Sequence, residues 1–177
     1  NGTPEEQFIM AEQFGQGIGV EMDLGESLRW YTRAAERGHA EAQRIVGDAL
    51  ARPGPDRDLV QAAGWYEKSA LQGNAQAQYT YGMFFVKGTG GNPKDPAQSV
   101  KWYAKAAIQG HAKAQYRLGR AYEAGEGVDG NLATAARWYA LAAEQVASAR
   151  LRLGVLHETG RGVEQDFVEA ARLYRLA

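Results

Sequence analysis

Apolar positions in this chain follow a pattern that recurs about every 36 residues. Within each period, two stretches carry apolar residues spaced three and four apart, which is typical of amphipathic helices. Glycine-rich or polar segments separate the stretches, and alanine and glycine greatly outnumber the β-branched residues that favour strands. The pattern predicts an all-α protein built from helix pairs.

Two sequence markers run in step and define the repeat. The first is an aromatic pair at spacings of 35, 37, 36 and 35 residues: Trp30-Tyr31, Trp65-Tyr66, Trp102-Tyr103, Trp138-Tyr139 and the degenerate Leu173-Tyr174. The second is a glycine within the other helix of each pair: Gly47, Gly82, Gly119 and Gly154, with Met10-Ala11 as a weaker first copy. Glycine inside a helix costs about 1 kcal/mol relative to alanine, so four in register indicate close helix packing.

Cap residues mark where the helices begin. Seven residues before each aromatic pair stands an N-cap candidate: Asp23, Asp58, Asp95, Asn131 or Asp166. Four of these are followed three residues later by Glu or Gln, which predicts a reciprocal capping box: Glu26, Gln61, Gln98 and Glu169. The aromatic helices are expected to end at Gly38, Gly73 and Gly110, and the other helices to open at Ala40, Ala75 and Ala112.

Stacked helix pairs of this kind predict a right-handed α-α superhelical solenoid of about four and a half repeats of 35–37 residues. We expect a single domain over residues 1–177, with repeats at approximately 4–38, 39–73, 74–110, 111–145 and 146–177. Because the chain begins at Asn1, we also expect it to be a segment of a longer protein.

Two irregularities stand out within the repeats. Between Ala143 and Leu153 the chain is one residue short and lacks the expected turn glycine, so this turn should be tighter or re-routed. The last helix stops at Ala177, soon after Tyr174, which is expected to leave an apolar end for another element to cover.

The residues carry a family resemblance. The pattern Ala-x-Ala-Gln-x-x-Leu-Gly-x-x-Tyr-x-x-Gly-x-Gly-Val, then Asp, then Ala-x-x-Trp-Tyr-x-x-Ala-Ala-x-x-Gly resembles the Sel-one-like repeat family, a branch of the tetratricopeptide superfamily. Residues 112–128 nearly spell its first part, and the resemblance spans almost the whole chain. It implies a non-catalytic adaptor that assembles protein complexes. It also implies a location in a bacterial periplasm or cell envelope, with the high ratio of arginine to lysine suggesting a bacterial source.

Composition narrows the chemistry. The chain has no cysteine and a formal net charge of −1 at pH 7, so disulfides and thiolate metal sites are excluded and general nucleic-acid binding is disfavoured. No apolar stretch is long enough to span a membrane. Gly125-x-Gly127-x-x-Gly130 matches a dinucleotide-binding loop only formally, because a helix and not a strand precedes it. We expect no cofactor, no metal and no catalytic residue.

Histidines and aromatic pairs have structural interpretations. His39 and His111 follow turn glycines in the slot that Asn74 fills, which favours helix capping over metal binding. His157 replaces an aromatic residue and is expected to be partly buried. The Trp-Tyr pairs recur with the repeat, so packing between helices explains them better than a stacking platform for sugars or bases.

A partner is expected to dock on positions that vary between repeats while the framework stays fixed. Numbered from the marker glycine, such positions form a stripe on one helix of each pair, which should line the concave wall. We expect it to bind an acidic, partly apolar peptide or helix of another protein, through Arg44, Ile45, Asp48, Tyr79, Met83, Phe84, Lys113, Tyr116, Arg117, Arg120 and Arg152. A solvated helix face is the alternative interpretation of the same residues.

Two other functions stay open at this stage. Exposed tyrosines beside carboxylates would suit a carbohydrate- or peptidoglycan-binding module. Charge is also uneven, since residues 1–29 carry six acids against one arginine while residues 100–122 carry five basic residues and no acid. That asymmetry favours self-association, so homo-oligomerisation competes with a foreign partner. An enzyme with an unfamiliar site is the least favoured of the alternatives.

Overall fold

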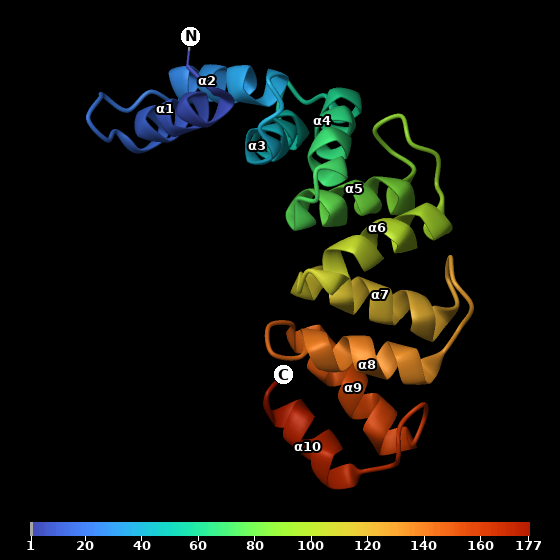
Figure 1. Cartoon of the computed structure of the whole chain (residues 1–177). Coiled ribbons are helices and arrows are strands. Elements are labelled where there is room, and N and C mark those ends of the chain that lie inside the picture. The colour runs from blue at the N-terminus through green and yellow to red at the C-terminus, as the bar shows by residue number, and fades with distance from the viewer. Residues whose placement is uncertain (1) are drawn as a thin grey trace. The chain divides into compact units, whose positions relative to one another are not determined.

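A computed structural model describes residues 2–177, which form ten α-helices and no β-strand (Figure 1). The chain divides into two compact units, which we describe separately. The first runs to Phe84 and includes Gly88–Pro93, and the second comprises Phe85–Lys87 and Lys94–Ala177. The boundary between them falls within helix α5 (Ala75–Lys87).

Helices that follow one another in sequence pack against one another in both units. The first unit contains α1 (Pro4–Gln16), α2 (Leu24–Glu36), α3 (Ala40–Ala51), α4 (Leu59–Leu71) and most of α5. The second contains the end of α5, then α6 (Pro96–Ile108), α7 (Ala112–Ala124), α8 (Leu132–Ala142), α9 (Ala147–Thr159) and α10 (Phe167–Arg175). Contacts join α1 to α2, α2 to α3 and α3 to α4, and likewise each helix from α6 to α10 to the next. The predicted all-α fold of helix pairs is confirmed, and its ten helices make about five repeats within residues 2–177, where the sequence predicted about four and a half.

The predicted N-caps are confirmed, but the capping boxes form only in part. Each cap side chain accepts first-turn N–H groups, as Asp58 does from Val60 and Gln61. In a full box the cap residue's own N–H would pair with the Glu or Gln side chain three residues on. It donates instead to a carbonyl near the end of the preceding helix, at 2.8–3.0 Å, in the pairs Asp23–Phe14, Asp58–Leu50, Asp95–Phe85, Asn131–Tyr122 and Asp166–His157.

The N–H of the cap residue finds this carbonyl because the end of the preceding helix leaves carbonyl groups free. The last four carbonyls of a helix have no partner within it, so one of them is available to the N–H of the next cap residue. All five accepting carbonyls occupy the same repeat position, three residues after the marker. Glu26 and Glu169, released from the box, pair with Arg29 and Arg172. One backbone hydrogen bond therefore closes each helix pair.

Close packing at the marker glycines explains the paired markers. A Cβ atom placed at Gly47 would lie 3.1 Å from the ring of Tyr66, and one at Gly154 would lie 2.5 Å from the ring of Tyr174. In these two repeats, and at Gly119 with Tyr139, the tyrosine that follows the marker thus lies over the glycine of the preceding helix. Tyr66 and Tyr139 are buried, which confirms that the aromatic pairs serve packing between helices.

The shortened turn between α8 and α9 is re-routed around Arg150. The four other repeats place a glutamine at this position. In three of them its Nε2 donates to the carbonyl eight residues earlier: Gln43 to Ala35, Gln78 to Ala70 and Gln115 to Ala107, at 3.0–3.1 Å. Arg150 donates instead from Nε to the Ala143 carbonyl, seven residues earlier, at 2.5 Å, and from Nη2 to the Glu144 carbonyl at 2.8 Å. The longer side chain satisfies carbonyls that the missing glycine turn would otherwise have paired.

Candidate functional site

The eleven residues predicted for partner binding fall in both units. Six lie on α3 and α5 in the first unit: Arg44, Ile45, Asp48, Tyr79, Met83 and Phe84. Five lie on α7 and α9 in the second unit: Lys113, Tyr116, Arg117, Arg120 and Arg152. The structure brings Arg44, Ile45 and Asp48 together around one pocket, and Arg117 and Arg120 around another.

The first-unit pocket has a volume of about 420 Å³ and lies between α1, α2 and α3. Arg44 on its wall is already bound, because its guanidinium contacts Glu41 at 2.6 Å and also pairs with Asp48. The second carboxylate oxygen of Asp48 accepts the Tyr66 hydroxyl at 2.6 Å. Arg44 is therefore a structural cation whose charge two carboxylates offset.

Protonation in this network follows from burial and pairing. Burial alone would raise the pKa of Glu41, but hydrogen bonds from Arg44 and Asn74 and the charge of Arg44 outweigh it, so the pKa is lowered. Burial, together with the hydrogen bond to Asp48, raises the pKa of Tyr66 well above its usual value of 10.0. The lowered pKa keeps Glu41 charged and the raised pKa keeps the Tyr66 phenol neutral at physiological pH.

Phe84 does not belong to an exposed surface, which corrects the prediction for this residue. Its side chain is 7% exposed, its ring centroid lies 5.8 Å from that of Tyr66, and the backbone of Gly90 packs against the ring. Two positions beyond the marker glycine, the helix turns its side chain toward α4 and the loop that follows α5. Tyr79 and Met83, in contrast, are half-buried.

In the second unit, α7 presents three basic residues and a tyrosine that we call the α7 cationic surface: Lys113, Tyr116, Arg117 and Arg120. The three basic side chains are exposed and Tyr116 is half-buried, with its ring centroid 5.9 Å from that of Tyr139. Within residues 2–177, neither Arg117 nor Arg120 has a hydrogen bond or an ion pair through its side chain.

Arg117 and Arg120 line a pocket of about 250 Å³ on this surface. Its other walls come from the end of α5, the first two turns of α6 and the end of α7, and include Val86, Pro96, Ser99, Tyr103 and Ala121. Glu126 is the acidic residue in the lining. The pocket combines two unpaired guanidinium groups with apolar walls, and it lies wholly within the second unit.

Arg152 differs from these two arginines. Its guanidinium lies 3.6 Å from the carboxylate of Glu123, which also accepts the Tyr139 hydroxyl at 2.5 Å. Burial and this hydrogen bond raise the pKa of Tyr139. Arg152 therefore borders a packed tyrosine–carboxylate pair, although its side chain stays 47% exposed.

The histidines act as helix caps, as the sequence predicted. Nδ1 of His39 accepts the N–H of Ala42 at 3.1 Å, and Nδ1 of His111 accepts that of Ala114 at the same distance. Across residues 2–177 no group of three or more His, Asp or Glu side chains is arranged to hold a metal ion. In the same range no helix is long and apolar enough to cross a bilayer.

Unpaired arginines beside apolar walls suit recognition of carboxylates on a partner. Arginine presents a planar fork of N–H donors that matches a carboxylate in two parallel hydrogen bonds. Such surface charges speed association and select partners more than they add affinity, so the apolar walls would supply contact area.

The Sel1 repeat family model matches the chain five times, over residues 7–39, 40–74, 75–111, 112–146 and 147–177. These five matches leave only the first six residues uncovered. Among curated proteins, no sequence matches the chain.

Solved structures resemble the chain along nearly its whole length. A protective antigen present in uropathogenic Escherichia coli strains, described as displaying an SLR fold, is 36% identical with a TM-score of 0.90; the match covers 99% of this chain and 38% of the antigen. A Sel1 repeat protein from Oxalobacter formigenes is 30% identical with a TM-score of 0.88, over 98% of this chain and 72% of that protein. The chain thus spans well under half of the antigen's length.

A more distant match shares the fold alone. An immunity protein from Pseudomonas aeruginosa is 21% identical with a TM-score of 0.57, and the match covers 99% of this chain and 67% of that protein.

Proposed function

The chain belongs to the Sel1 repeat family, and on that premise we propose that its α7 cationic surface binds an acidic, partly apolar segment of a partner protein. Sel1 repeat proteins are generally non-catalytic protein-interaction scaffolds. The proposal adds to that general role a place on the molecule and a chemistry for the partner.

The observation that carries the proposal is the contrast between arginines. Arg44 and Arg172 are held by carboxylates at 2.6 Å, whereas Arg117 and Arg120 line a pocket with no ion-pair partner among the described residues. Residues three apart on a helix lie on one face, so the two guanidinium groups can bind one acidic segment together.

The apolar walls of the pocket are the reason to expect a partner segment that is partly apolar as well as acidic. Val86 and Tyr103 flank the arginines, and Tyr116 lies one position before Arg117 on α7. Tyrosine and arginine are enriched at the energetic centres of interfaces. Because helices hold these side chains in place before binding, the ordering cost falls mainly on the partner.

An affinity capture with matched variants tests the proposal. The parent chain, the Arg117→Glu, Arg120→Glu variant and an Arg137→Glu, Arg175→Glu variant are each immobilised and exposed to extract from the source cells. The last variant makes the same change in charge on exposed arginines of α8 and α10. We expect a protein that the parent and the α8/α10 variant retain and that the α7 variant loses, identified by mass spectrometry.

Other outcomes would contradict the proposal. If all three chains retain the same protein, the binding surface lies elsewhere on the molecule. If the chains retain only copies of themselves, the domain is chiefly a self-assembly unit, as the uneven charge would favour. Thermal unfolding of each variant must match the parent, since exposed substitutions usually change stability by about 0.5 kcal/mol or less.

A proposal for the cellular location of the protein rests on one of the similar structures. The Escherichia coli structure is described as a protective antigen, and on that likeness we propose that this chain's protein is located at a bacterial envelope. Fractionation of source cells with an antibody against the chain would test this, with the expected signal in the envelope or periplasmic fraction.

A further inference from the structure

Helix α10 departs from the repeat at the residue before its tyrosine. Tyr174 lies over Gly154 as Tyr66 lies over Gly47, so the two tyrosines hold equivalent positions. The preceding residue is Trp65 in α4 but Leu173 in α10. Tryptophan also stands at this position in α2, α6 and α8, as Trp30, Trp102 and Trp138.

The place that the indole occupies elsewhere can be read from Trp65. Its ring packs against a cluster on α2 and α3 made of Ala34, Ala35, Ala42 and Val46. In the second unit, three repeats later along the chain, the corresponding positions hold Ala142, Ala143, Ala149 and Leu153. Leu173 packs against that second cluster. A leucine thus stands where the first cluster receives an indole ring.

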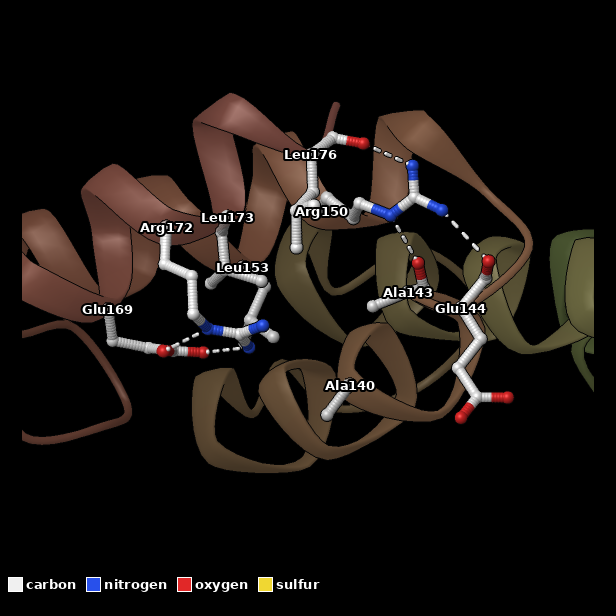
Figure 2. Close-up of a pocket in the computed structure, with 9 residues that line it drawn as sticks. All are labelled: Ala140, Ala143, Glu144, Arg150, Leu153, Glu169, Arg172, Leu173 and Leu176. Atoms are coloured by element: carbon white, nitrogen blue, oxygen red, sulfur yellow. Dashed lines mark hydrogen bonds and ion pairs between the residues drawn. The ribbon is translucent and has the colours of Figure 1, made fainter.

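A pocket of about 480 Å³ lies at this place, between α8, α9 and α10 (Figure 2). Its apolar lining comes from Ala140, Ala143, Leu153, Leu173 and Leu176. In Figure 2, Leu153 and Leu173 lie between the Glu169–Arg172 pair on one side and Arg150 on the other. Ligand pockets in proteins range over about 300–1,000 Å³, so a bicyclic ring can enter.

Both arginines that line the pocket already donate hydrogen bonds within the chain. Arg172 donates two hydrogen bonds to Glu169, at 2.7 and 2.6 Å. Arg150 donates to the carbonyls of Ala143, Glu144 and Leu176. An anionic occupant therefore finds no arginine without hydrogen-bond partners here, and it also meets the Glu144 carboxylate in the lining, which favours a neutral apolar group. A carboxylate accepts about four hydrogen bonds, so Glu169 can still accept an indole N–H.

We propose that this pocket binds the tryptophan side chain of a partner protein, which supplies to the last helix the residue that the other repeats carry themselves. Three of those tryptophans are stacked by a basic residue three positions later, with the cation 4.1–4.6 Å from the ring centroid: Arg33 on Trp30, Lys68 on Trp65 and Lys105 on Trp102. In α10 this position holds Leu176. The partner segment is therefore expected to carry Trp followed by Lys or Arg one helical turn later. The site does not depend on the α7 cationic surface.

The probe for this site is a synthetic peptide with the sequence of residues 59–71, which contains Trp65 and Lys68 in the required spacing. Its control is the same peptide with the tryptophan replaced by alanine. Binding is followed by NMR on the chain labelled at leucine and valine methyl groups. We expect saturable shifts at Leu153, Leu173 and Leu176 with the first peptide, and an affinity at least about tenfold lower for the control, equal to 1.4 kcal/mol or more.

Filling the pocket from within the chain provides the matched variant. Leu173→Trp is expected to raise the melting temperature and to abolish the saturable shifts at Leu153 and Leu176. Leu151→Trp adds the same side chain at a 47% exposed position of α9 outside the pocket, and it should leave peptide binding unchanged. Ala140→Leu narrows the pocket from the exposed face of α8 and should weaken binding even if Leu173→Trp fails to fold.

Three results would overturn the proposal. One is the absence of saturable shifts with the tryptophan peptide. Another is equal binding of the two peptides, which would show that the indole is not the anchor. The third is undiminished binding by Leu173→Trp or, should that variant be unfolded, by Ala140→Leu.

Discussion

The Cβ atom that any other residue would carry at Gly119 lies 2.7 Å from the ring of Tyr139, closer than two carbon atoms can approach. Tyr139 is fully buried, and its hydroxyl donates to Glu123 at 2.5 Å, so the ring is held at both its edge and its tip. The buried position of Tyr139 thus requires glycine at residue 119. The same pairing at Gly47 with Tyr66 and Gly154 with Tyr174 makes it a rule of the repeat.

Substitution of this glycine should therefore be costly. Gly119→Val is expected to lower the free energy of unfolding by roughly 1–3 kcal/mol or more, because the added methyl groups force α7 and α8 apart. Chemical denaturation of the two chains measures the difference. A Gly119→Val chain that unfolds at the parent's denaturant concentration would show that this face of α7 does not pack as described.

Gly64 provides the control for that experiment. It lies inside α4, and among the described residues outside its immediate neighbourhood no heavy atom lies within 4 Å of the place that a Cβ atom would take, so a side chain there meets open space. Gly64→Ala should raise stability by up to about 1 kcal/mol, because alanine is the better helix former. A loss of stability in Gly119→Val and a gain in Gly64→Ala would separate the effect of helix packing from that of helix propensity.

The re-routed turn after α8 depends on one side chain. Arg150→Ala removes donors from the carbonyls of Ala143 and Glu144 and should cost about 1.5–3 kcal/mol, the usual range for hydrogen bonds that involve a charged group. Hydrogen exchange should show the loss concentrated at the amides that end α8 and begin α9. A uniform loss across the second unit, or none, would argue against a local role for Arg150.

The half-formed capping boxes give a prediction with an internal control. Asp95→Ala should cost about 1 kcal/mol, because the Asp95 side chain accepts the N–H of Gln98 at 3.0 Å. Gln98→Ala should change stability by about 0.5 kcal/mol or less, since its side chain makes no hydrogen bond within residues 2–177. Thermal unfolding measures both losses of stability. Equal losses for the two variants would show that the complete capping box, which the sequence pattern indicates, does form.

Buried tyrosines make stability depend on pH in alkali. Burial and the charge of Glu67 raise the pKa of Tyr81 to about 12, and burial with a hydrogen bond to Glu123 raises that of Tyr139. The unfolded chain ionises at the usual value of 10.0. The two tyrosines therefore contribute fully to the free energy of unfolding below pH 10. This contribution is lost as the pH rises through their pKa values in the folded chain.

Tyrosinate absorbance across an alkaline titration checks this. We expect part of the tyrosine signal to appear only above about pH 12, in step with unfolding. Tyr139→Phe should reduce the loss of stability in alkali and cost about 1 kcal/mol at neutral pH through the missing hydrogen bond. Complete ionisation of a still-folded chain near pH 10 would contradict the buried environment.

Sequence periodicity predicted the fold well because one physical rule repeats. Caps such as Asp58, marker glycines such as Gly119 and the aromatic pairs each recur at fixed spacing, and each has a local cause. The capping boxes were harder, because the competing acceptor for the Asp58 N–H is the Leu50 carbonyl, a tertiary contact that no spacing of side chains reveals.

Candidate site residues were harder to predict, since exposure depends on neighbours from other helices. Position in the repeat placed Phe84 next to a binding stripe, yet Tyr66 and Gly90 bury it. Nothing in the pattern shows that Arg44 is offset by two carboxylates while Arg117 is not. The pocket beside Leu173 was signalled by the missing tryptophan, although only the packing of Trp65 reveals what that absence leaves open.

The backbone hydrogen bond that closes each helix pair spans eight residues in one case and nine or ten in the others, with the same donor and acceptor positions. The intervening loop is therefore anchored at both ends by groups that every residue type except proline at the donor possesses. Its length can change, as these cases show, without disturbing the helices. The segment between Leu50 and Asp58, where a Cβ atom at Gly54 would meet open space, is accordingly a natural place to graft an epitope or a foreign recognition peptide onto the chain.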